Sequence, residues 1–291
     1  MACATRVIAW AYSPVNPVVV TSFLQAGVWP RLLARQHQVL YVQCDHMQPL
    51  ASIRHAIHEQ FEIPHEQLQT LTLAALLELA VKHLQQQGQS TKLVLILDQF
   101  EQFFIRQRYQ QDRKAFVEAL THWYQHPEHS VKIMMSVCND FIGRMYELQN
   151  TLGYTLAPNQ NFMLTSFESS EAATVFKTIV GIDNIAYEGM LAEALNTDAL
   201  VSASDGLIAP ADLQILAWMV ASGDDLEQRC TTLSAMKKTS DTQVLQNLFL
   251  QQLLDLCQTE KQRQTVLKVL LGMIDLDNNI SAGSLTETEL Q

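Results

Sequence analysis

The chain has 291 residues, of which 48% are hydrophobic and 17% charged, and its formal net charge at pH 7 is −11. This length allows one large domain or two to three small ones, and the apolar content is enough for a full hydrophobic core. The acidic balance argues against nucleic-acid binding, which depends on basic surface. Residues 15–20 are apolar but are too few for a signal sequence or a membrane span.

The number and spacing of the cysteines indicate the cellular compartment in which the protein is expected to function. The five cysteines are odd in number and widely scattered, and none of them lies in a Cys-x-x-Cys spacing. This pattern favours neither a zinc site nor a disulfide framework. We therefore expect a cytoplasmic protein that does not associate with a membrane.

The first 167 residues alternate between predicted strands and predicted helices. Apolar runs predict strands at residues 7–12, 38–44, 92–97, 131–138 and 162–167. Amphipathic spacing predicts helices at residues 21–36, 50–59, 68–87, 112–126 and 140–149. Residues 13–20 contain two prolines and are expected to form a loop, with Thr21 or Ser22 as the N-cap of the following helix. The alternation predicts an α/β fold with a parallel, doubly wound sheet.

After residue 167 the strand pattern stops. Helical spacing continues at residues 168–180, 187–195, 210–221, 244–257 and 261–274, which predicts a separate helical subdomain. We expect a core at residues 1–167, a helical lid at residues 168–258, and an incomplete helical or winged-helix element at residues 259–291. The short N-terminal lead and the polar, acidic end suggest a piece of a longer protein.

The most informative stretch is residues 92–104, KLVLILDQFEQFF. Its continuous apolar run suits a strand buried on both faces, and Asp98 follows at the carboxyl end, where open α/β sheets bind ligands. Glu101 adds a second carboxylate three residues later. Mg²⁺ prefers such oxygen ligands and shares them with substrate phosphates, as in the Walker B element of P-loop NTPases. The alternative is that the two carboxylates simply end a strand and cap a helix.

The segment that should bind phosphate has the right position but the wrong residues. A phosphate loop needs glycines for close backbone approach, a Lys for the β- and γ-phosphates, and a Ser or Thr for Mg²⁺. Thr21 stands at the hydroxyl position, but Val20 replaces the Lys, and Pro14 and Val19 replace the two glycines. As written, this loop should not cradle a triphosphate. A single-base frame slip is an open alternative, since another frame of the same codons can encode a glycine-rich loop.

The chain resembles the STAND class of AAA+-related P-loop ATPases, and within it the novel STAND branch. The matching segments, in chain order, are LQAGVWPRL (residues 24–32), QPLASIRHAI (48–57), LILDQFEQFF (95–104), MMSVCNDFIGRMYEL (134–148), LTSFESSEA (164–172), GLIAPADLQIL (206–216) and VLLGMIDLDNNISAG (269–283). They span nearly the whole chain, and DQFE after an apolar strand with AGVWPRL upstream is the most specific combination. The resemblance implies a P-loop sheet followed by an all-helical lid.

The resemblance also implies roles for individual residues near the sheet. Asp98 would hold Mg²⁺ through water, and Glu101 would orient or activate the attacking water. Thr21 would be the Mg²⁺ hydroxyl ligand, with Ser22 beside it at the nucleotide. Thr21 has the alternative of serving only as an N-cap.

The remaining implied positions lie further along the chain. Ser136 keeps the hydroxyl expected at the end of the fourth strand, but Cys138 stands where the family has a sensor Arg. A neutral thiol cannot form the charged hydrogen bonds with the γ-phosphate that an Arg guanidinium forms. Pro210 matches a lid proline that packs on adenine, although it could also simply open a helix.

The implied function is a regulatory ATPase module of a STAND signalling protein, with ATP and Mg²⁺ bound between core and lid. Such a switch would work with other domains or chains of a larger signalling protein and could form a nucleotide-driven homo-oligomer. The missing Lys and glycines favour an alternative, a non-enzymatic pseudo-NTPase scaffold for protein contacts. A fragment of a damaged gene is a third interpretation.

Overall fold

The computed structural model describes residues 8–13, 17–44, 48–107, 109–126, 130–153, 160–180, 206–221, 250–251, 253–272, 274–275 and 280–281. The chain divides into two compact units, Met1–Thr165 and Ser166–Gln291. The helix predicted at residues 187–195 and half of the one at residues 244–257 lie outside the described residues.

The first unit is built on a five-stranded parallel sheet with strand order β2-β3-β4-β1-β5. Its strands are β1 (Ile8–Ser13), β2 (Gln38–Gln43), β3 (Leu93–Asp98), β4 (Val131–Cys138) and β5 (Asn161–Met163). Every residue of β3 is buried, which explains its continuous apolar sequence. The predicted parallel α/β sheet is confirmed.

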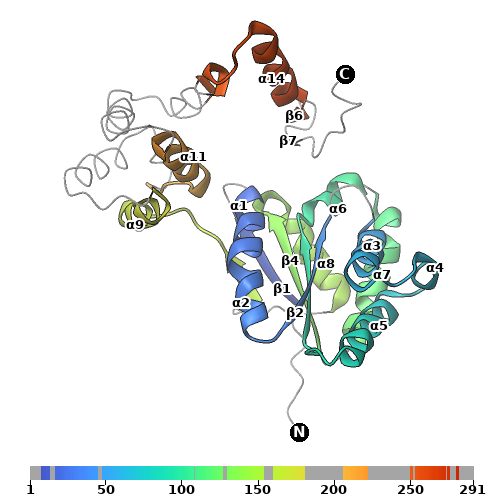
Figure 1. Cartoon of the computed structure of the whole chain (residues 1–291). Helices are drawn as coiled ribbons and strands as arrows, with labels where there is room; N and C mark the ends of the chain where they lie inside the picture. Colours follow the sequence, from blue (N-terminus) through green and yellow to red (C-terminus); the bar gives the residue numbers. More distant parts are fainter. Residues whose placement is uncertain are drawn as a thin grey trace. The chain divides into compact units, whose positions relative to one another are not determined.

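Helices cover both faces of this sheet (Figure 1). One face carries a continuous helical segment made of α1 (Pro17–Ser22), a π-helix (Phe23–Val28) and α2 (Trp29–Ala34). The other face carries α3 (Pro49–Phe61), α5 (Leu73–Gln86), α7 (Gln110–Gln125) and α8 (Ile142–Leu152). Right-handed crossovers produce this division, because the chain moves along the sheet in opposite directions after β1 and after β2.

The second unit contains helices and one short strand pair among its described residues. The helix α9 (Ser169–Val180) packs on α11 (Pro210–Ala221), and Phe167 and Ile208 exchange backbone hydrogen bonds of 2.8 Å. The helix α14 (Glu260–Gly272) precedes β6 (Ile274–Asp275), which pairs antiparallel with β7 (Ile280–Ser281). Across the described parts of both units, no helix is long and apolar enough to cross a membrane.

The expected loop at residues 13–20 is largely wrong. Ser13 belongs to β1 and the helix already begins at Pro17, so only residues 14–16 separate the two elements. Pro is tolerated in the first turn of a helix, where its missing N–H has no partner to lose. Val20 is 1% exposed, so its burial against the sheet outweighs the low helix propensity of valine. Thr21 and Ser22 therefore lie inside the helix, and the predicted N-cap is wrong.

The clearest further differences from the prediction concern two helical segments and β5. The helix expected at residues 68–87 is two helices, α4 (His65–Leu68) and α5, because Thr72 caps α5 by accepting a 3.3 Å hydrogen bond from the Ala75 N–H. The helix α6 (Glu101–Arg106) was not predicted, since its FF-rich sequence continues the apolar pattern of β3. The strand expected at residues 162–167 ends at Met163.

Gly143 in α8 and Gly153, the residue directly after it, give a matched test of backbone conformation. Gly153 ends the helix with a φ of 64°, whereas Gly143 lies inside it, and a Cβ at either would meet nothing within 4 Å. We expect Gly153→Ala to lower the free energy of unfolding by about 1 kcal/mol, because alanine is strained at positive φ. Gly143→Ala should raise it by about 0.5 kcal/mol. Urea unfolding measures both, and equal effects would contradict this account of the helix end.

Candidate functional site

The site lies at the carboxyl edge of the sheet, where Asp98 is the last residue of β3. The register of β2 on β3 pairs Asp98 with Gln43, and β1 and β4 end together at Ser13 and Cys138. Asp98 has no exposed surface. A carboxylate in this position needs several hydrogen-bond donors, because burial without them is costly.

Three hydroxyl groups supply these donors. Thr21 of α1 donates to Asp98 Oδ2 at 2.7 Å, and Tyr41 of β2 donates to the same oxygen at 2.5 Å. Ser136 of β4 donates to Asp98 Oδ1. Both carboxylate oxygens are therefore engaged by side chains from three different elements.

The turn after Asp98 is fixed by the same serine. Gln99 has a φ of 55°, and its N–H donates to Ser136 Oγ at 2.8 Å. The Phe100 N–H donates to the Ser136 carbonyl oxygen, also at 2.8 Å. This sharp turn ends β3 and starts α6 at Glu101, which brings the second carboxylate back toward the end of β4.

Glu101 is 5% exposed and accepts a 3.1 Å hydrogen bond from the Cys138 N–H. Burial raises the pKa of Glu101 from its ordinary 4.5 to about 7, and the nearby Asp98 charge acts in the same direction. Burial also raises the pKa of the Cys138 thiol, so this side chain remains neutral near pH 7. Cys138, which stands where the family resemblance implies a sensor Arg, therefore brings no positive charge to the site.

The predicted site residues divide into two groups. The structure brings Thr21, Asp98, Glu101 and Ser136 to one corner of the first unit. Ser22 is exposed on α1 and makes none of these contacts. Pro210 is the first residue of α11 in the second unit, and its role remains a prediction.

Sequence reasoning missed Tyr41. Its hydroxyl also accepts a 3.1 Å hydrogen bond from Gln25 Nε2, and its ring stacks on Trp29 with centroids 5.6 Å apart. Burial and the contact with Asp98 raise the pKa of Tyr41 above its ordinary value. The available signal was a residue with a polar tip in an otherwise apolar strand, next to the strand that carries Asp98.

These residues fit a magnesium ion better than they fit a triphosphate. The carboxylate of Asp98 and the hydroxyls of Thr21 and Ser136 form the oxygen donor set that Mg²⁺ prefers. The phosphate-binding segment does not fit, because α1 starts at Pro17 and contains neither Lys nor Gly. The side chains at this corner could therefore hold Mg²⁺, whereas α1 offers neither a lysine nor a glycine to a phosphate.

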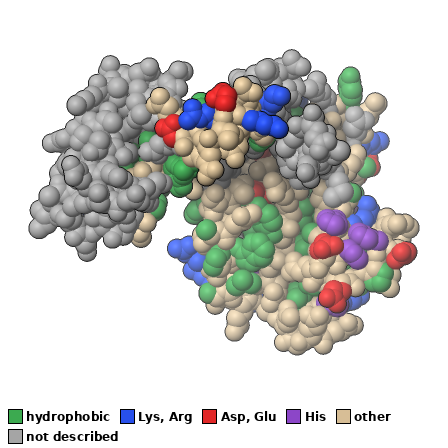
Figure 2. Space-filling view, turned by 45° about the horizontal axis from the view of Figure 1, so that its top comes forward, with side chains coloured by type: hydrophobic (Ala, Val, Ile, Leu, Met, Phe, Trp, Pro, Cys, Tyr) green, Lys and Arg blue, Asp and Glu red, His purple; other side chains and the backbone are tan. Residues whose placement is uncertain are grey.

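Histidine rings gather at a second place, on α3 and α4. His58 and His65 stack with centroids 3.8 Å apart, and His58 Nδ1 lies 2.8 Å from the Ile63 carbonyl oxygen. Figure 2 shows histidines beside acidic side chains on one face of the molecule. Within the described ranges, no group of three His, Cys, Asp or Glu side chains is arranged to hold a metal.

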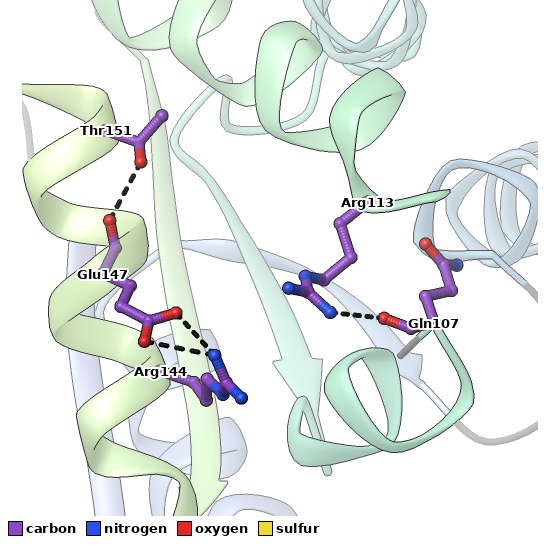
Figure 3. A network of polar contacts seen from close by, with 5 residues as sticks. All are labelled: Gln107, Arg113, Arg144, Glu147 and Thr151. Carbon is purple, nitrogen blue, oxygen red and sulfur yellow. Dashed lines mark hydrogen bonds and ion pairs between the residues drawn. The ribbon is translucent and has the colours of Figure 1, made fainter. Parts of the chain in front are cut away.

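A pocket of about 850 Å³ lies between α7 and α8, and it contains none of the site residues above. Its charged groups are engaged within the protein (Figure 3). Arg144 pairs with Glu147 at 2.9 Å, and Arg113 donates to the Gln107 carbonyl oxygen at 2.5 Å. We assign no ligand to this pocket.

Comparison with solved structures supports the fold. Two structures of the ORC2 protein of Aeropyrum pernix are similar to this chain. The complex with ADPNP and ADP has a TM-score of 0.54 at 13% identity, covering 96% of this chain and 72% of that one. The ADP form has a TM-score of 0.55 at 14% identity, covering 79% of this chain and 63% of that one. At these identities the likeness establishes the α/β fold alone.

Comparison with sequences supplies the family. Curated proteins gave no significant match. The family model described as Novel STAND NTPase 1 matches residues 21–221, which is more than half of the chain. It begins at Thr21, directly after the residues that depart from a phosphate loop, and it includes Asp98, Glu101 and Ser136. The chain therefore belongs to the Novel STAND NTPase 1 family and is an NTPase-type module.

Proposed function

We propose that this chain is the regulatory switch module of a STAND signalling protein, which binds ATP with Mg²⁺ weakly and hydrolyses it slowly or not at all. The observation that carries the proposal is the convergence of Thr21 and Ser136 on Asp98, with Glu101 beside them, at the carboxyl edge of a parallel sheet. Ligands bind at this edge in open α/β folds. Family membership makes a nucleotide the expected ligand.

The residues present support particular roles. Asp98 and Thr21 would hold Mg²⁺, and Ser136 would orient Asp98 and the turn that follows it. A bound Mg²⁺ would neutralise phosphate charge. Glu101 would hold the attacking water and accept its proton, because a base with a pKa of about 7 is well matched to neutral pH.

Weak binding follows from what the chain lacks. Val20 gives no ammonium group for the β- and γ-phosphates, and Cys138 gives no guanidinium. The remaining contacts can still shift an equilibrium between two arrangements of the protein if nucleotide binds one of them better. In this proposal, residues 168–258 act as the lid and Pro210 contacts the adenine.

The switch would act on other parts of a larger system. We propose that its partners are further domains or chains of a signalling protein in the cytoplasm, and that nucleotide promotes a homo-oligomer. The net charge of −11 gives no support for a nucleic-acid partner.

Thermal unfolding with millimolar Mg-ATP tests the proposal. Ligand at about ten times its Kd should raise the Tm by about 3 °C. Asp98→Asn should abolish this shift, whereas Glu78→Gln, which changes an exposed carboxylate on α5, should leave it intact. The absence of a shift in the unsubstituted protein would contradict nucleotide binding.

One observation favours the alternative of a pseudo-NTPase scaffold. The helix from Pro17 takes the place of the phosphate loop, and both carboxylate oxygens of Asp98 accept hydrogen bonds from hydroxyls of the described residues. A scaffold of this kind would show no thermal shift with Mg-ATP. It would still bind its protein partner when Asp98 is replaced by Asn, which separates the two functions.

A further inference from the structure

Among the described hydroxyl donors to Asp98, Tyr41 is the one that the resemblance to P-loop ATPases does not predict. It donates to Oδ2 at 2.5 Å, the same oxygen that accepts from Thr21 at 2.7 Å. A divalent cation, or the water through which it binds, needs a free lone pair on this carboxylate. Two hydroxyls occupy both lone pairs of Oδ2, the oxygen beside the Thr21 hydroxyl, whereas among the described donors only Ser136 donates to Oδ1.

The three hydroxyls are not equivalent toward a metal. Thr and Ser hydroxyl oxygens can turn and serve as Mg²⁺ ligands, as the P-loop hydroxyl does. A neutral phenol, by contrast, is a poor ligand for Mg²⁺. Thr21 and Ser136 can therefore stay when a metal binds at Oδ2, whereas the hydrogen bond from Tyr41 to that oxygen has to break.

Tyr41 is held in place by the helical segment on its own face of the sheet. Gln25 donates to its hydroxyl at 3.1 Å from within the π-helix Phe23–Val28, and Trp29 stacks on its ring with an interplanar angle of 16°. π-Helical turns occur often at functional sites. The contacts of Tyr41 thus connect Asp98 to the irregular part of the helix that follows β1.

We propose that Tyr41 competes with a divalent cation for Asp98 Oδ2, so that metal binding at this oxygen releases Tyr41 from Asp98 and from its contacts with Gln25 and Trp29. The proposal rests on the proposed function, because it assumes that Asp98 is a metal-binding carboxylate. It makes Tyr41 a regulator of that site rather than a catalytic residue.

Mn²⁺ binding without nucleotide tests the competition directly. Electron paramagnetic resonance of free Mn²⁺ gives the Kd for the full chain and its variants. Tyr41→Phe keeps the stacked ring and removes only the hydroxyl, so it should tighten Mn²⁺ binding about tenfold, the usual effect of one hydrogen bond to a charged group. Tyr109→Phe, at a side chain that is 70% exposed, is the matched control and should bind like the unsubstituted protein. Asp98→Asn should not bind.

The outcomes separate the two proposals. Equal or weaker Mn²⁺ binding by Tyr41→Phe, with binding in the unsubstituted protein that Asp98→Asn abolishes, overturns the competition and leaves the metal site standing. Binding by neither the unsubstituted protein nor Tyr41→Phe overturns both. Binding that appears only in Tyr41→Phe, and is lost when Asp98→Asn is added, supports both.

A second measurement follows Tyr41 itself. Release of its ring should change the tryptophan fluorescence when MgCl₂ is added, because Trp29 stacks on that ring. Trp29→Phe should remove most of this change. A change of equal size in Asp98→Asn would show that Mg²⁺ acts elsewhere and would overturn the coupling.

Discussion

Replacing Asp98 with alanine is expected to lower the free energy of unfolding of the sheet unit by about 3 kcal/mol. Three hydroxyls, from Thr21, Tyr41 and Ser136, donate to this buried carboxylate and would lose their charged acceptor together. Each unpaired buried group costs about 1–3 kcal/mol, and relief of the buried charge offsets part of the sum. Chemical denaturation, followed by circular dichroism, measures the difference.

Two variants make this result specific. Asp98→Asn keeps the shape and one acceptor oxygen and should cost less, about 1–2 kcal/mol. Glu78→Ala removes an exposed carboxylate, whose 2.6 Å pair with Lys82 lies on the surface of α5, and should cost at most about 0.5 kcal/mol. If Asp98→Ala left the free energy of unfolding unchanged or raised it, the desolvation penalty of the buried carboxylate would exceed the stabilisation from its three hydrogen bonds. Asp98 would then be kept at the expense of stability.

The site around Asp98 could be predicted in part because a buried parallel strand has a recognisable sequence, a continuous run of apolar residues. The apolar run of β3 and the carboxylates at Asp98 and Glu101 could be placed at the carboxyl edge without coordinates. Ser136 came only from the family resemblance, since nothing in its own strand pattern marks it. Its contacts with Asp98 and with the turn depend on the order β3-β4 in the sheet, which the sequence does not state.

Tyr41 and the first helix show what pattern reasoning could not reach. Alternation in β2 places Tyr41 on the face opposite Leu40 and Val42, but it does not say which strand lies alongside. The register pairs Tyr41 with Ile96, two residues before Asp98, and only the long phenol spans this diagonal. The helix that begins at Pro17 was missed because propensity was weighed without the burial of Val20.

Replacing Glu101 with glutamine is expected to change the pH dependence of stability. The carboxyl has a pKa of about 7 in the folded protein and about 4.5 when unfolded, so the folded state holds its proton more tightly. Stability from this group is fully present below pH 4.5 and is lost as the pH rises through 7. Between pH 5 and pH 8 the unsubstituted protein should lose roughly 2–3 kcal/mol that Glu101→Gln keeps.

The measurement is the difference in unfolding free energy between the two proteins at pH 5 and at pH 8, because other titrating groups cancel in that difference. Glutamine preserves the size of the side chain and an oxygen that can accept from the Cys138 N–H, so packing should be unchanged. A difference that does not vary with pH would show that Glu101 is ionised at its ordinary pKa, and it would then be a weaker base than proposed. A difference that grows toward pH 8 would mean that folding holds Glu101 in an environment that penalises its charge. Such an environment adds nothing to stability at neutral pH, so it is better explained by a role in proton transfer or in metal-linked switching than by a role in the fold.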